Sequence, residues 1–269
     1  MSEVHMMRLA FNRTVITISA SVAMVFISVM IISGNSYAVT GVLDRSAAKT
    51  SNQFCANLAT ETAKVTEKMT SLSEKLSQAW TTQDTQVASK LKQIDTDVTA
   101  RREQAETNLN SNFAKLEAKA ITDAQKQAVQ DYETVIKTAV SIRRAAYDTA
   151  RQTFRDAVKE QVALRRSIVL GQQDTFKSSV DSAIIAAKAT CLDDGTSSTA
   201  RTTYQTAMKA ARDAFQNSRT EDNSIKNRVQ EFATTRNSTF ESANQAFKAS
   251  LESAKLTLQQ AFGEDKASI

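Results

Sequence analysis

The sequence predicts an all-α protein with an N-terminal signal or anchor helix, followed by an elongated antiparallel coiled-coil bundle of about three long helices. The chain has no proline and only five glycines in 269 residues. Since these two residue types interrupt helices, their scarcity favours long uninterrupted helices. Residues 15–32 carry no charge, and apolar residues recur at alternating steps of three and four in much of the remainder, which is the spacing of a coiled-coil seam.

Residues 1–38 have the layout of an export signal. Arg8 and Arg13 precede the uncharged run, and Ser36 and Ala38 are small residues in the positions that a signal peptidase requires. We expect cleavage after Ala38. The alternative is an uncleaved anchor, because residues 15–32 are just long enough to cross a bilayer as a helix. Either case places residues 39–269 outside the cytoplasm, secreted or at the cell surface.

The seam of the first long helix, expected at about 41–120, passes Trp80 without a glycine or proline. We therefore favour a continuous helix there over a restart at Thr81. Thr122 and Gln125 match a capping box, which predicts that the second helix starts at 122. It is expected to run to about 191, and Gly171 is a candidate irregularity.

The third helix is expected at about 198–262. It follows a predicted loop at 191–196 and ends at Gly263. A weak repeat links the second and third helices, with aromatic or small residues at Tyr147 and Phe154, Tyr204 and Ala211, and Phe240 and Phe247. This pattern is typical of a packed seam, and the alternative is a repeated docking face.

The two cysteines of the chain, Cys55 and Cys191, test this topology. In an exported protein an even pair favours a disulfide. In a hairpin of two straight helices, facing residues are equally far from the turn. The midpoint between the cysteines is position 123, inside the independently assigned capping box. Both observations predict a Cys55–Cys191 bridge, with catalytic thiol chemistry as the alternative.

The composition argues against most enzyme classes. The only histidine, His5, precedes the uncharged run, and no glycine-rich phosphate loop is present. Without histidine the chain lacks the usual nucleophile–base pairs, and two cysteines alone cannot complete a tetrahedral zinc site. We therefore predict no catalytic, cofactor or metal site.

Partners can be described only by class. The net charge is +5, and three basic dipeptides, Arg101-Arg102, Arg143-Arg144 and Arg165-Arg166, could contact an anionic surface polymer. Acidic residues are interspersed, so a solvated face of mixed charge is the simpler interpretation, and no specific nucleic-acid partner is expected. A protein partner or a homo-oligomer remains open, because a seam can be satisfied within one chain or between chains.

Several segments together resemble a group of uncharacterised exported helical proteins from small-genome candidate-phyla bacteria (Patescibacteria). They are Phe54-Cys55, residues 122–129, Cys191 and residues 207–215. The resemblance covers most of residues 50–219. It implies a bacterial cell-surface protein and brings no known activity or site residues.

The leading functional hypothesis is a non-enzymatic, extracytoplasmic spacer, scaffold or adhesive element that binds through its helix faces. A membrane-active or pore-forming protein is a second hypothesis, although outside residues 15–32 the apolar stretches are short and contain charges. The ectodomain of a single-span sensor is a third.

Overall fold

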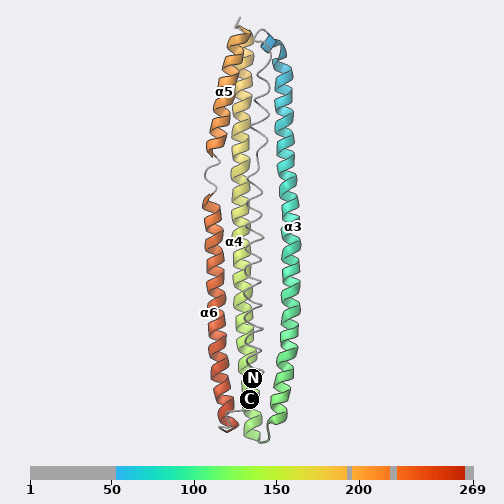
Figure 1. The fold of residues 1–269 in the computed structure, drawn as a ribbon, viewed down its shortest axis with the longest axis vertical. Coiled ribbons are helices and arrows are strands. Elements are labelled where there is room, and N and C mark those ends of the chain that lie inside the picture. The colour runs from blue at the N-terminus through green and yellow to red at the C-terminus, as the bar shows by residue number, and fades with distance from the viewer. Residues whose placement is uncertain (1–52, 193–195, 219–222, 264–269) are drawn as a thin grey trace, which may run out of the picture. The chain divides into compact units, whose positions relative to one another are not determined.

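In the computed structural model, the described residues are 53–192, 196–218 and 223–263. They contain four helices and no strand: α3 (Phe54–Lys119), α4 (Asp123–Leu192), α5 (Ser197–Ser218) and α6 (Asn223–Ala261) (Figure 1). The all-α prediction is therefore confirmed. The predicted export segment, its cleavage point after Ala38 and the expected helical start at about 41 lie outside the described residues.

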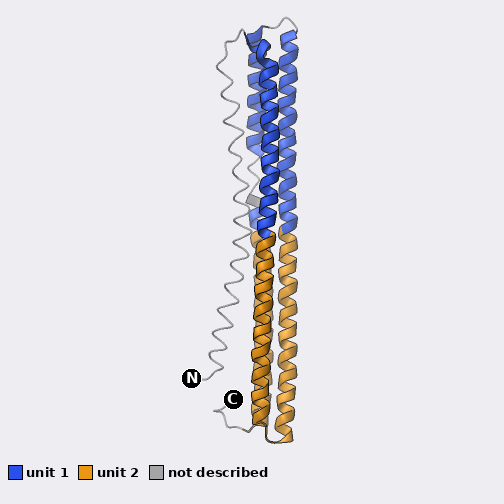
Figure 2. Cartoon of the chain, turned by 90° about the vertical axis from the view of Figure 1, so that its right-hand side faces the viewer, with its two compact units in different colours: residues 1–87, 159–228 blue, residues 88–158, 229–269 orange. Residues whose placement is uncertain are grey.

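The chain divides into two compact units, which are coloured separately in Figure 2. Unit 1 takes its described residues from 1–87 and 159–228, and unit 2 from 88–158 and 229–269. Because α3 and α4 are continuous, each of them contributes to both units. Unit 1 also contains α5 and the first residues of α6, while unit 2 contains the rest of α6.

The core of unit 1 combines three helices. Val65 and Met69 of α3 pack with Phe176, Val180 and other residues of α4 and with Met208 and Ala211 of α5. The apolar positions of each helix recur on one face, so three such faces bury one another. Phe176 and Phe215 bring α4 and α5 together, with ring centroids 5.2 Å apart.

The core of unit 2 is also formed by three helices, with α6 in place of α5. One cluster joins Phe113 of α3, Ile136 of α4 and Ala254 of α6, and another joins Ala120, Val129 and Leu258. Val129 and Leu258 are almost completely buried. Phe113, one of the apolar positions of the predicted 3–4 spacing, is therefore buried in this unit.

The turn between α3 and α4 has the predicted capping box. The backbone N–H of Gln125 donates to Thr122 Oγ1 at 3.2 Å, and Gln125 Oε1 accepts from the N–H groups of Thr122 and Ile121 at 3.1 and 2.9 Å. These bonds satisfy amides that a helix start leaves without partners. The predicted start at 122 is confirmed to within one residue, and α4 ends at Leu192.

Neither suspected irregularity interrupts a helix. α3 is unbroken through Trp80, and α4 is unbroken through Gly171. A Cβ atom added to Gly171 would meet nothing within 4 Å, so no close approach requires glycine there. Gly263 follows the end of α6 with a φ of 76°, a conformation that favours glycine, as the sequence predicts.

The single third helix predicted at 198–262 is wrong, because the structure has α5 and α6 on either side of residues 219–222. Residues 216–224 are all polar, so they offer no apolar side chain to a seam. At the end of α5, Gln172 Nε2 donates to the Ser218 carbonyl at 2.6 Å, and Ser218 Oγ donates to the Phe215 carbonyl at 2.8 Å. Side chains thus satisfy terminal carbonyls that another helical turn would have used.

Many threonines bond within their own helix. Thr66, Thr70, Thr96 and Thr99 of α3 each donate their hydroxyl to the carbonyl four residues earlier, and so do Thr134 of α4 and Thr234 of α6. Such bonds keep an exposed hydroxyl satisfied but slightly weaken a helix. Threonine also has a low helix propensity. Packing between helices must therefore supply much of the stability.

Candidate interaction surfaces

The predicted disulfide is present. Cys55, the second residue of α3, is bonded to Cys191 near the end of α4, with Cα atoms 5.7 Å apart. Beside it, the rings of Phe54 and Tyr204 lie 5.8 Å apart and connect α3 with α5. The two cysteines are 136 residues apart in sequence. Their bond ties the start of α3 to the end of α4 within unit 1.

A row of ion pairs joins α3 and α4 in unit 2. Arg155 contacts Asp95 at 2.7 and 3.1 Å, and Arg102 contacts Asp148 at 2.7 and 2.9 Å. In the third pair, Arg144 Nη1 lies 3.3 Å from Glu106 Oε2. Each step forward along α3 is matched by an equal step back along α4, so the two segments run in opposite directions in this unit. Bidentate pairs of this kind fix geometry as well as charge.

Asp148 is the most heavily bonded carboxylate of the row. It also forms an ion pair with Arg151, one turn further along α4. Partial burial raises the pKa of Asp148, but hydrogen bonds and charge interactions with Arg102 and Arg151 outweigh burial, so the pKa lies below its usual 3.8. The carboxylate is therefore held in its charged form.

Unit 1 has one pair of the same type. Arg166 contacts Asp84 at 2.7 and 2.8 Å, and its guanidinium lies 5.4 Å from the centre of the Trp80 ring. The hydrogen bonds from Arg166 lower the pKa of Asp84 below 3.8, against a smaller opposing effect of burial. Trp80 thus packs against an ion pair between α3 and α4.

Two arginines of unit 2 are packed against aromatic rings. Arg236 of α6 is only 4% exposed, lies 4.5 Å from the centre of the Phe154 ring and donates to Asn237 Oδ1 at 2.9 and 3.2 Å. Arg143 of α4 lies 3.9 Å from the centre of the Phe247 ring. Burial lowers the pKa of both guanidinium groups. Arginine nevertheless stays charged in proteins, so these are stable cation–π contacts.

Four of the six arginines in the basic dipeptides therefore form contacts between helices. Arg102, Arg144 and Arg166 each bind a carboxylate on another helix, and Arg143 packs on Phe247. Sequence reasoning placed the dipeptides on a solvated face and missed these contacts. The equal separations of acidic residues on α3 and arginines on α4 were the available signal.

The sequence repeat lies in packed seams. Tyr147 of the first copy stacks on Phe240 of the third, with ring centroids 4.3 Å apart, and Phe154 is 2% exposed. Tyr204 and Ala211 of the second copy belong to the core of unit 1. Their positions support the packed-seam interpretation over a repeated docking face.

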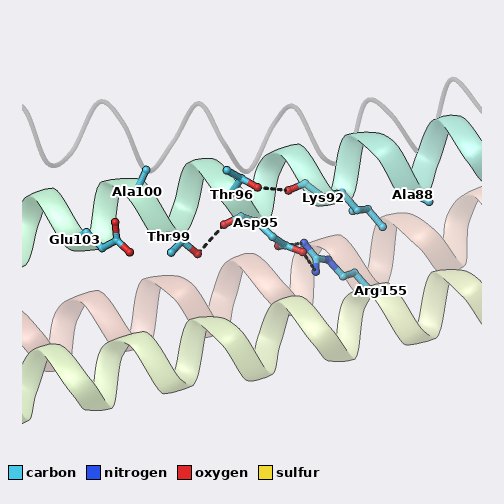
Figure 3. A pocket seen from close by; sticks show the side chains of 9 residues that line it. Ala88, Lys92, Asp95, Thr96, Thr99, Ala100, Glu103 and Arg155 are labelled. Carbon is cyan, nitrogen blue, oxygen red and sulfur yellow. Dashed lines mark hydrogen bonds and ion pairs between the residues drawn. The ribbon is translucent and has the colours of Figure 1, made fainter.

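One groove lies along α3 in unit 2 (Figure 3). Its described lining includes Ala88, Leu91, Lys92, Thr96, Thr99 and Glu103, and Arg155 reaches Asp95 from α4 at its margin. The lining mixes small, apolar and charged side chains.

The described part of the chain contains no group of three or more histidine, cysteine, aspartate or glutamate residues that could hold a metal ion. In the same residues, no helix is both long and apolar enough to cross a membrane. Comparisons with protein families, curated proteins and solved structures find no match.

Proposed function

We propose that the exported part of the chain, residues 39–269, is an elongated antiparallel coiled-coil bundle that serves outside the cytoplasm as a non-enzymatic spacer or scaffold. One observation carries this proposal. α3 and α4 are unbroken over 66 and 70 residues, and a disulfide joins the start of one to the end of the other. A helix of that length spans roughly 105 Å if straight, which suits a part that holds other surfaces apart.

The contacts made by arginine side chains support the same role. Four arginine–carboxylate pairs link α3 to α4, and two further arginines pack on aromatic rings. These groups fix helices to one another, so their charge is committed to internal contacts. The opposite running directions of α3 and α4 in unit 2 support the antiparallel arrangement, and a disulfide is typical of proteins that work in an oxidising compartment.

Residues 1–38 would direct export, with cleavage after Ala38. The mature protein would then contact its partners, a protein or an anionic surface polymer, through exposed helix faces. The membrane-active and sensor hypotheses stay predictions, and leakage of dye from liposomes would revive the first.

Location and shape test the proposal together. In intact producing cells, added protease should degrade the protein, and its purified form should begin at Val39. Small-angle X-ray scattering of the monomer should give a radius of gyration of roughly 30 Å, as for a rod built on a 70-residue helix. A compact protein of this size would give about 17 Å. Protection from protease in intact cells, or the compact value, would contradict the proposal.

A further inference from the structure

The middle of α3 is less buried than the corresponding part of α4. Between Val65 and Phe113 no residue of α3 is buried, and in unit 2 its apolar residues Leu91, Ile94 and Val98 are only partly covered. Over the corresponding part of unit 2, α4 buries Ala150, Phe154 and Val158. The groove described above runs along this partly covered stretch of α3.

The groove contains a regular stripe, which we call the α3 stripe: Lys92, Thr96, Thr99 and Glu103. These residues follow one another at steps of four, three and four, so they share one face of the helix. All four are exposed. Within the described residues, neither Lys92 nor Glu103 belongs to an ion pair.

The spacing and the charges of the α3 stripe make it complementary to itself. If a second α3 lies alongside in the opposite direction, with the two-fold axis between Asp97 and Val98, Thr96 of one copy faces Thr99 of the other. Lys92 then faces Glu103 at both ends. A two-fold interface repeats each contact twice, so the arrangement contains two equivalent ion pairs and small side chains at its centre.

We propose that the α3 stripe is a homodimer interface, in which two copies of the chain pair their α3 helices in opposite directions. Leu91, a partly covered apolar residue that also lines the groove, would be shielded by such pairing. Thr96 and Thr99 already donate their hydroxyl groups within α3, so they can be covered without losing a hydrogen bond. The ion pairs fix the register of the two copies.

The N-terminal residues are a poorer fit for this groove. This step rests on the proposed cleavage after Ala38, which leaves residues 39–52 ahead of the described chain. Along α3, Lys92 lies about 57 Å from Phe54 at a rise of about 1.5 Å per residue. The fifteen steps from Phe54 back to Val39 reach about 54 Å at most when fully extended. The uncleaved run at 15–32 carries no charge with which to pair Lys92 or Glu103.

The test is sedimentation equilibrium of the protein purified after export, with its disulfide intact and its mass recorded to establish the N-terminus. The wild type should dimerise in the micromolar range. Lys92→Glu would place like charges opposite each other twice, so dimerisation should weaken at least about tenfold. Glu103→Lys should do the same. The double variant Lys92→Glu/Glu103→Lys restores both pairs and should dimerise like the wild type.

Lys115→Glu is the matched control, because it makes the same charge change on another face of α3 and should leave the dimer unchanged. Circular dichroism of each variant checks that the fold persists, and rescue in the double variant excludes simple misfolding. A protein that stays monomeric at 100 micromolar, or a dimer indifferent to both single variants, would overturn the proposal. A retained N-terminus in the mass would contradict the proposed cleavage independently of the dimerisation result.

Discussion

Arg236 lies over the ring of Phe154, 4.5 Å from its centre, although both side chains are buried. The contact joins α6 to α4 in unit 2. A second arginine, Arg143 of α4, lies over Phe247 of α6. The two contacts are reciprocal, since each helix supplies one cation and one ring. The two contacts favour one register of α6 against α4, which apolar packing alone would specify less strictly.

Phe154 should be among the most sensitive positions of the seam. Phe154→Ala removes a ring that is 2% exposed, so the free energy of unfolding should fall by about 3–5 kcal/mol. Thr153→Ala, at the exposed neighbouring position, should change it by less than about 0.5 kcal/mol. Urea titration followed by circular dichroism measures both. Equal losses at the two positions would show that the assigned faces are wrong.

The Asp95–Arg155 pair can be tested by exchanging its charges. Asp95→Arg and Arg155→Asp should each lower the free energy of unfolding by about 1 kcal/mol, because each puts like charges together on α3 and α4. The double exchange should recover most of the loss. Urea is the suitable denaturant, since guanidinium would screen the pair. No recovery in the double variant would argue against direct pairing.

The disulfide should be a major contributor to stability. It spans 136 residues of sequence, and the loss of chain entropy in the unfolded state corresponds to about 4–5 kcal/mol. Cys55→Ser/Cys191→Ser should therefore unfold at a clearly lower urea concentration. Dithiothreitol should shift the wild type by a similar amount and leave the double variant unaffected. A wild type indifferent to reduction would mean that the bridge is absent in solution.

Two carboxylates should give the protein a defined sensitivity to acid. The folded-state pKa values of Asp84 and Asp148 lie below 3.8. Their stabilisation is therefore complete above the unfolded pKa of about 3.9 and is lost as the pH falls through the lower folded values. Asp84→Asn/Asp148→Asn should lower the melting temperature at pH 7, and the gap from the wild type should narrow below pH 4. A gap that stays constant down to pH 2 would contradict these assignments.

The turn at 120–122 was the most predictable part of the fold. Its capping box is local, because Thr122 and Gln125 contact each other within one helical turn. The cysteine pair added an independent distance constraint, and the bridge confirms it. Local chemistry was sufficient to locate the start of α4, and the spacing of the cysteines was sufficient to predict their bridge.

The division of the third predicted helix was harder to foresee. No glycine or proline marks residues 216–224, and the sequence signal is only a gap in the apolar spacing. The bond from Gln172 of α4 to the Ser218 carbonyl is a tertiary contact, which helix propensities do not contain. A break without a punctuating residue therefore requires knowledge of the neighbouring helix.

The arginine contacts could not be derived from charge alone. Arg102 and Asp148 are 46 residues apart, and their meeting depends on the register between α3 and α4. A shift of α4 by two residues would separate every pair in the row. Composition predicted a solvated surface because it counts charges without knowing which helix faces which.

The threonine hydroxyls that bond back into their own helices have a consequence for how the chain folds. A helix rich in such residues is marginal by itself, so a peptide covering α6 alone should be largely random coil in water. Helix formation and docking then become a single cooperative event within each unit. Amide protons of the helices in a unit should exchange with solvent together, because a helix that loses its neighbours also loses its own hydrogen bonds.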